Sequence, residues 1–234
     1  MKKSGLRRAS CFLIPIISIL LSPVVYGDDH HEIPSFYPLI QRLSGDGFDP
    51  EFLCKLFADP RMEFVPVVTT ISRYATESPG RYIRFMNPES VLISKHFLRK
   101  NHTILRQMEK RFNVEKEVAV AILLVESRFG ENIGRHRVIP TLASMALMDS
   151  PENLRENFLI LQQNDPELPY EWMEALAKKK AGWAYQELKC FLNIIREEKI
   201  DPLEVYGSTA GAMGMAQFVP SSYLNYALRK RSFQ

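Results

Sequence analysis

The sequence predicts a mainly α-helical protein with little or no β-structure. Signals for helix starts recur along the chain, as in Asp49 to Glu51 and Asn87 to Glu89, where a capping side chain precedes a proline and an early acid. Apolar residues then follow at spacings of three and four, which is the period of a helix. No long run alternates between apolar and polar residues, so no major sheet is predicted. With 234 residues, 46% of them hydrophobic, the chain is long enough for one sizeable core.

These signals place the elements approximately. The predicted helices run from 50 to 59, 88 to 112, 115 to 129 and 172 to 198, and one more begins at Pro220. Residues 60–88 are expected to hold a short strand or a loop. Residues 149–169 are polar and interrupted by prolines, and we expect them to form a surface excursion.

The first 27 residues have the pattern of a secretory signal peptide. Four basic residues precede an apolar run from Cys11 to Val25, and small side chains at Val25 and Gly27 suit a cleavage site. The run spans 15 residues, fewer than the roughly 20 that a membrane-spanning helix needs. We therefore expect residues 1–27 to be removed during export, and an uncleaved membrane anchor is the less favoured alternative.

Removal of the signal changes the charge of the chain. The signal holds four of the 30 Lys and Arg and none of the 27 Asp and Glu, which leaves 26 basic and 27 acidic residues. A balance near zero gives no support to nucleic acid as a partner. Two cysteines remain, Cys54 and Cys190, and the sequence leaves both a disulfide and two free thiols open.

Glu126 raises the main functional question of the sequence. The residues AVAILLV precede it, and apolar side chains occupy almost every face, so we expect a central, buried helix that Gly130 ends. Apolar surroundings and the negative end of the helix dipole both disfavour a charged carboxylate. An acid that keeps its proton near neutral pH is suited to general acid catalysis. The alternative is a carboxylate that ends a buried segment and pairs with a base such as Arg128.

A second segment is rich in glycine. It spans residues 206–223, YGSTAGAMGMAQFVPSSY, and is called the glycine-rich segment below. It is no phosphate loop, because no Gly-Lys-Ser/Thr follows. Small residues at this density allow a ligand to approach the backbone, and a sugar chain would fit, with hydrogen bonds from Ser208 and Gln217 and apolar faces from Met213 and Tyr223. Tight packing between helices is the alternative.

These segments together resemble the lytic murein transglycosylases, specifically the membrane-bound lytic transglycosylase B family. VESRFGENIGRH, residues 125–136, is similar to the motif that carries the family's catalytic glutamate. GSTAGAMGMAQFVPSSY, residues 207–223, is similar to the motif that lines the glycan groove, and VIPTLASMAL, residues 138–147, to the segment between them. The resemblance extends over most of the chain after the signal.

The resemblance implies a periplasmic protein with a lysozyme-like helical fold. The implied reaction cleaves the MurNAc–GlcNAc β-1,4 bond of peptidoglycan glycan strands and leaves a 1,6-anhydromuramoyl end. Glu126 matches the single catalytic carboxylate, Ser208 and Gln217 match positions that hold the sugar, and Tyr82 lies close to a groove tyrosine. No cofactor or metal is expected. A non-catalytic peptidoglycan-binding protein and a hydrolytic muramidase remain alternatives.

Two stretches depart from the family pattern. Asp149 to Glu152 and a polar insertion replace an aromatic-Pro-Arg-Arg stretch that the family usually carries. After Tyr223 the family continues into further helices, whereas this chain reads LNYALRKRSFQ. We therefore expect residues 28–234 to form one lysozyme-like domain that is shortened at its C-terminal end, with uncovered apolar faces and impaired activity.

Overall fold

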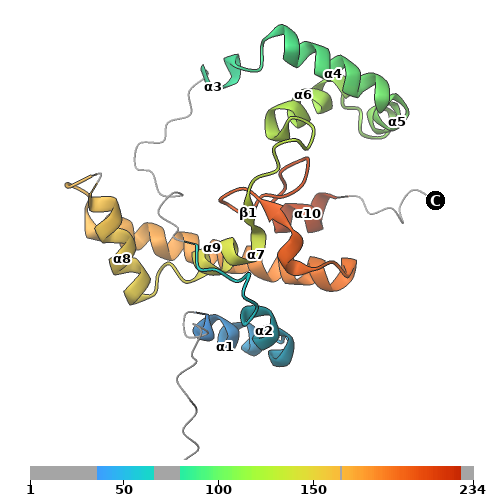
Figure 1. Ribbon diagram of the computed structural model, residues 1–234. Coiled ribbons are helices and arrows are strands. Elements are labelled where there is room, and N and C mark those ends of the chain that lie inside the picture. Colours follow the sequence, from blue (N-terminus) through green and yellow to red (C-terminus); the bar gives the residue numbers. More distant parts are fainter. Residues whose placement is uncertain (1–35, 66–79, 164, 228–234) are drawn as a thin grey trace, which may run out of the picture. The chain divides into compact units, whose positions relative to one another are not determined.

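The computed structural model describes residues 36–65, 80–163 and 165–227, and these residues are mainly helical, as predicted (Figure 1). The helices are α1 (Tyr37–Gly45), α2 (Pro50–Phe57), α3 (Gly80–Ile83), α4 (Pro88–Lys100), α5 (His102–Phe112), α6 (Lys116–Ser127), α7 (Val138–Ala146), α8 (Pro151–Gln162), α9 (Tyr170–Glu198), the 3-10 helix η2 (Pro202–Glu204) and α10 (Pro220–Tyr226). Two short strands, β1 (His136–Arg137) and β2 (Tyr206–Gly207), pair antiparallel. The predicted signal peptide lies outside the described residues.

Side-chain caps followed by proline begin three of the described α-helices. Asp49 accepts a hydrogen bond from the N–H of Glu51 at the start of α2, and Asn87 caps α4 by accepting from the N–H of Ser90. Ser150 caps α8, which forms inside residues 149–169, the stretch that we expected to be a surface excursion. The helix itself was not predicted, because Pro151 occupies the first helical position, where proline favours a helix instead of breaking it.

Two helix boundaries also differ from the prediction. The predicted helix 88–112 is divided into α4 and α5 at Asn101, which has non-helical dihedral angles and donates its side-chain amide to the carbonyl of Phe97. Helix α6 ends at Ser127 and not at Gly130, because Arg128 and Phe129 adopt left-handed conformations with φ of 50° and 61°.

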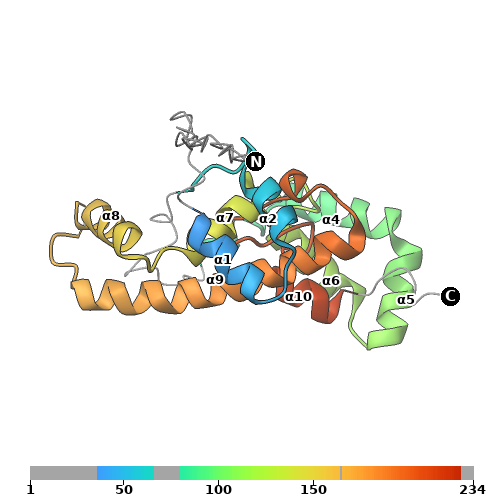
Figure 2. The same ribbon diagram turned by 90° about the horizontal axis from the view of Figure 1, so that it is seen from below.

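The core forms around α7 and α9, which pack against each other (Figure 2). Every residue of α7 is buried, and α9 contributes a buried stripe that includes Ala177, Ala181 and Leu188. Tyr185 of α9 donates its hydroxyl to Asp46 at 3.0 Å, and the guanidinium of Arg42 lies 3.5 Å from the centre of the Tyr185 ring. Burial and this hydrogen bond raise the pKa of Tyr185 to about 12. These contacts fix α1 on α9.

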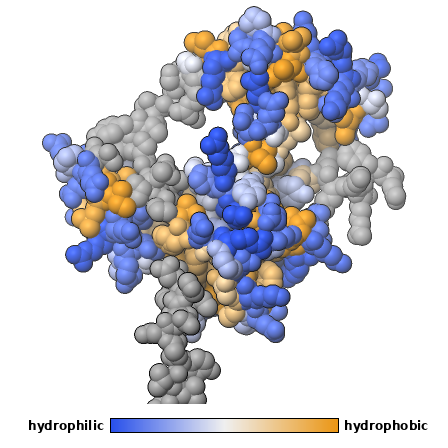
Figure 3. All heavy atoms as spheres, in the orientation of Figure 1, coloured by the Kyte–Doolittle hydropathy of each residue, from blue (hydrophilic) through white to orange (hydrophobic). Residues whose placement is uncertain are grey.

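Helix α6 is not the central, buried helix that the sequence predicted. It packs against α4 and α5, and its Val120 and Leu124 are buried, whereas Val118 and Ile122 are 46% and 52% exposed. Figure 3 shows apolar side chains at the surface of this part of the molecule. The apolar composition of α6 therefore did not predict its burial correctly, because none of the described residues covers the face that carries Val118 and Ile122.

The remaining expectations concern the cysteines and the membrane. Both thiols are free, with Cys54 exposed and Cys190 half-buried. Among the described residues, no helix has both the length and the apolar character needed to cross a membrane.

Candidate active site

Glu126 lies in the last turn of α6, and its side chain is exposed, so the apolar surroundings that the sequence predicted are absent. The alternative pairing with Arg128 is not formed either. Arg128 contacts the carboxylate of Glu89 and bonds Glu131 at 2.9 Å, and the carboxylate of Glu89 raises the pKa of the Arg128 guanidinium. Within the described residues, Glu126 forms no hydrogen bond or ion pair, so its carboxyl group is available to a ligand.

The turn after α6 holds Glu126 at the end of its helix. Phe129 stacks on Phe97 of α4, with ring centroids 4.3 Å apart and planes inclined by 14°. The N–H of Arg128 closes the last turn on the carbonyl of Leu124 at 3.0 Å. The end of the helix is thus fixed by an aromatic contact and a backbone hydrogen bond.

Ser127 connects the end of α6 to the glycine-rich segment. This serine is 1% exposed, and its hydroxyl donates to the carbonyl of Met215 at 2.6 Å while it accepts from the N–H of Gly130 at 2.9 Å. The residue next to Glu126 is therefore bonded to a residue 88 positions further along the chain. Sequence reasoning missed both Ser127 and Met215, and the only signal was a small polar residue at the end of an apolar run.

Further contacts join the same two parts of the chain. Strand β1 pairs with β2, with His136 opposite Gly207 and Arg137 opposite Tyr206. Gly134 has a φ of 101°, and a Cβ there would overlap the backbone of Gly207. A side chain at position 134 would therefore separate the two segments.

The glycines of the glycine-rich segment have two different functions. A Cβ at Gly207 would collide with the carbonyl of Ala212, and one at Gly211 would press on the side chain of Leu142, so both positions serve close packing. Gly214, in contrast, is exposed, and a Cβ at this position would meet no other atom within 4 Å. The packing alternative thus describes part of the segment, while Gly214 leaves backbone open to a ligand.

Gln217 and Ser208, the polar candidates, use part of their hydrogen-bonding capacity inside the protein. The side-chain amide of Gln217 donates to the carbonyls of Ile133 and Gly214 at 3.1 and 2.8 Å. Because carbonyls only accept, the NH₂ group must point at them and the amide oxygen points elsewhere. The hydroxyl of Ser208 accepts from the N–H groups of Ala210 and Ala212, at 3.2 and 3.1 Å, and keeps one hydrogen to donate.

The other candidate residues differ in their placement. Met213 is half-buried and packs against the core, and its backbone forms two hydrogen bonds with Phe218. Tyr223 is half-buried on α10. Tyr82 lies on α3 with 49% of its surface exposed, and no hydrogen bond in the described part of the chain connects it to Glu126 or to the glycine-rich segment. The structure thus places Glu126, Ser208 and Gln217 on segments that hydrogen bonds join, and within the described residues no such bond connects Tyr82 to these segments.

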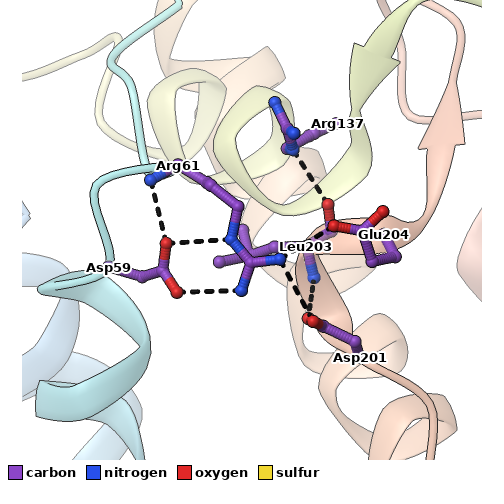
Figure 4. A network of polar contacts seen from close by, with 6 residues as sticks. All are labelled: Asp59, Arg61, Arg137, Asp201, Leu203 and Glu204. Carbon is purple, nitrogen blue, oxygen red and sulfur yellow. Dashed lines mark hydrogen bonds and ion pairs between the residues drawn. The ribbon is translucent and has the colours of Figure 1, made fainter.

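An ion-pair network fixes η2, the short helix that precedes the glycine-rich segment (Figure 4). Arg61 bonds Asp59 at 2.9 Å, Asp201 at 3.1 Å and Glu204 at 2.8 Å, and Arg137 donates to the carbonyl of Leu203 at 2.9 Å. The Arg61 hydrogen bonds lower the pKa of Asp59 to about 2. These contacts tie η2, which directly precedes β2, to the loop after α2. In the residues described, no group of three or more His, Cys, Asp or Glu is arranged to hold a metal ion.

Comparison with known proteins shows the family of this chain. The family described as "Transglycosylase SLT domain" matches residues 34–231. Membrane-bound lytic murein transglycosylase B from Escherichia coli (strain K12) is 30% identical over 145 residues, which are 62% of this chain and 32% of that protein.

Solved structures agree with this match. The soluble lytic transglycosylase SltB1 from Pseudomonas aeruginosa has a TM-score of 0.64 and 29% identity, over 86% of this chain and 59% of that one. The Escherichia coli lytic transglycosylase SLT35, in a complex with bulgecin A, has a TM-score of 0.64 and 25% identity, over 88% and 58%. This chain spans about a third of the curated relative and about three fifths of these structures. The chain therefore belongs to the transglycosylase SLT domain family and is of the membrane-bound lytic transglycosylase B type.

Proposed function

We propose that this protein is a periplasmic lytic transglycosylase that cleaves the MurNAc–GlcNAc β-1,4 bond of peptidoglycan, with Glu126 as its single catalytic carboxylate. The observation that carries the proposal is the hydrogen bond from Ser127 to the carbonyl of Met215, which links the residue beside the Glu126 carboxyl group to the glycine-rich segment. The family membership and the murein transglycosylase relative support the same reaction.

Glu126 acts first as an acid and then as a base in the proposed reaction. Its proton passes to the glycosidic oxygen as the bond from that oxygen to C1 of the muramoyl residue breaks. The resulting carboxylate then takes the proton of the C6 hydroxyl, whose oxygen bonds to C1 and closes the 1,6-anhydro ring. The substrate hydroxyl supplies the nucleophile, so water is not consumed.

The glycine-rich segment holds the sugar in this proposal. Ser208 retains a hydroxyl hydrogen and Gln217 an amide oxygen, so the pair offers one donor and one acceptor to a sugar. Gly214 lets the ring approach the backbone, since no side chain stands there. Met213 and Tyr223 contribute apolar surface, and Tyr82 would contribute from α3.

A reaction with a single acid also fits the charges at this end of α6. Most glycosidases use two carboxylates on opposite sides of the bond that breaks. Two other acids at this end of the helix, Glu131 and Glu89, are both engaged by Arg128. A cyclising mechanism needs no second acid, because the substrate's own hydroxyl attacks.

The test is a digestion of purified sacculi by residues 28–234 and by the Glu126→Gln variant. Glu131→Gln, which removes the neighbouring carboxylate, is the matched control. We expect anhydro-muramoyl ends from the wild type and from Glu131→Gln, and none from Glu126→Gln. Reducing ends would identify a hydrolytic muramidase instead. Binding of sacculi without any release would identify a non-catalytic peptidoglycan-binding protein.

A further inference from the structure

Glu187 is a buried acid that the proposed reaction does not use. It lies in the middle of α9 and is 4% exposed. Burial of a carboxylate is costly unless hydrogen bonds compensate for the lost water. Within the described residues Glu187 has no ion pair, so a cation does not provide this compensation.

Both oxygens of Glu187 bond to one residue of the glycine-rich segment. Oε2 accepts from the backbone N–H of Ser221 at 2.8 Å, and Oε1 accepts from the hydroxyl of Ser221 at 2.7 Å. Ser221 lies in the first turn of α10, where backbone N–H groups have no partner within the helix. The residue at the N-cap position, Val219, provides no side-chain hydrogen bond. Glu187 therefore caps α10 from another helix, and its negative charge suits this end of the helix.

This contact is the last of a series that holds the glycine-rich segment. Its start is held by the pairing of β1 with β2, and its middle by Ser127 and Gln217. Its end is held by Glu187, through the packing of α10 on α9. Tyr223 follows Ser221 by two positions on the same helix.

We propose that Glu187 is a positioning residue, which fixes the end of the glycine-rich segment and Tyr223 for glycan binding without touching the reacting atoms. The proposal rests on the proposed function, because the segment is taken to hold the substrate. It predicts that loss of the Glu187 contact weakens glycan binding more than it slows the chemical step.

The test compares four variants in steady-state cleavage of soluble glycan oligomers. Glu187→Leu removes both hydrogen bonds, and we expect KM to rise roughly tenfold while kcat changes less. Glu187→Gln still accepts from the N–H and can donate to the hydroxyl, so we expect KM close to that of the wild type. Ser221→Ala keeps only the backbone bond and is expected to give an intermediate KM. Glu174→Gln is the matched control on the same helix, where the carboxylate pairs with Lys178 at the surface.

Backbone hydrogen exchange at Ser221 provides a readout without activity. We expect the amide to be protected in the wild type, Glu174→Gln and Glu187→Gln, and to exchange faster in Glu187→Leu. If Glu187→Leu does not fold, the KM of Ser221→Ala decides. A wild-type KM in Ser221→Ala or Glu187→Leu, or a fall in kcat alone, would overturn the positioning role. Absence of anhydro products from the wild type would overturn the proposed function instead, and the exchange of Ser221 would then still test the contact.

Discussion

Ser127 is the residue that joins the two halves of the candidate site. It was not predicted, because its partner is a backbone carbonyl far along the chain, and sequence does not show which carbonyl a hydroxyl will meet. Glu126 was predicted at the end of its helix, but its exposure was not, since the apolar residues before it do not surround its carboxyl group. The sequence therefore indicates Glu126 as the candidate catalytic residue but does not show how exposed its carboxyl group is.

The Ser127→Ala variant tests this connection. The substitution leaves the Met215 carbonyl and the Gly130 N–H without their buried partner. We therefore expect the free energy of unfolding to be about 1–3 kcal/mol lower than in the wild type. We also expect weaker cleavage of sacculi, because the glycine-rich segment is released from the end of α6. Urea unfolding measures the first effect and muropeptide release the second. Thr103→Ala, which removes an exposed hydroxyl on α5, is the control and should show neither loss.

Among the helices, capping residues predicted the start of a helix more accurately than apolar periodicity predicted which of its faces are buried. Asp49 and Asn87 correctly indicated α2 and α4. Helix α8 has the same signal at Ser150 and was missed because its polar composition suggested a loop. Helix α6 was expected to be buried on all faces, but Val118 and Ile122 are exposed. An apolar composition shows which side chains would gain from burial, but not which of them other parts of the protein cover.

The two faces of α6 give the next prediction. Ile122 is 52% exposed and Leu124 is 8% exposed. We expect Ile122→Gln to change the free energy of unfolding by no more than roughly 0.5 kcal/mol, whereas Leu124→Ala should cost about 2–5 kcal/mol. Urea unfolding of both variants makes the comparison. An equally large loss in Ile122→Gln would show that another part of the protein covers this face.

The Arg61 network gives a dependence of stability on pH. In the folded protein, Arg61 holds the pKa of Asp59 at about 2, below its ordinary value of 3.8. A lowered pKa stabilises the folded state above about pH 4, and this contribution is lost as the pH falls toward 2. We expect Arg61→Gln to reduce the fall in Tm between pH 6 and pH 3. The difference should be small, because exposed ion pairs are weakened by water. Parallel Tm curves for the two proteins would contradict this account.

At the scale of the whole molecule, the helical class and the family were both predicted from the sequence, and both are confirmed. Class follows from local signals that repeat along the chain. The family follows from two motifs whose residues prove to be joined through Ser127, Gln217 and the β1–β2 pair. The signal peptide, the shortened domain and the role of each sugar-holding residue stay predictions.

In the proposed reaction one carboxyl group, that of Glu126, acts as both acid and base while the substrate's own hydroxyl closes the ring. The most direct measurement is cleavage of soluble glycan oligomers in water labelled with a heavy oxygen isotope, with the products analysed by mass. We predict anhydro-muramoyl ends that contain no label, and no cleavage by Glu126→Gln. Labelled reducing ends would show that water attacks and would contradict the account.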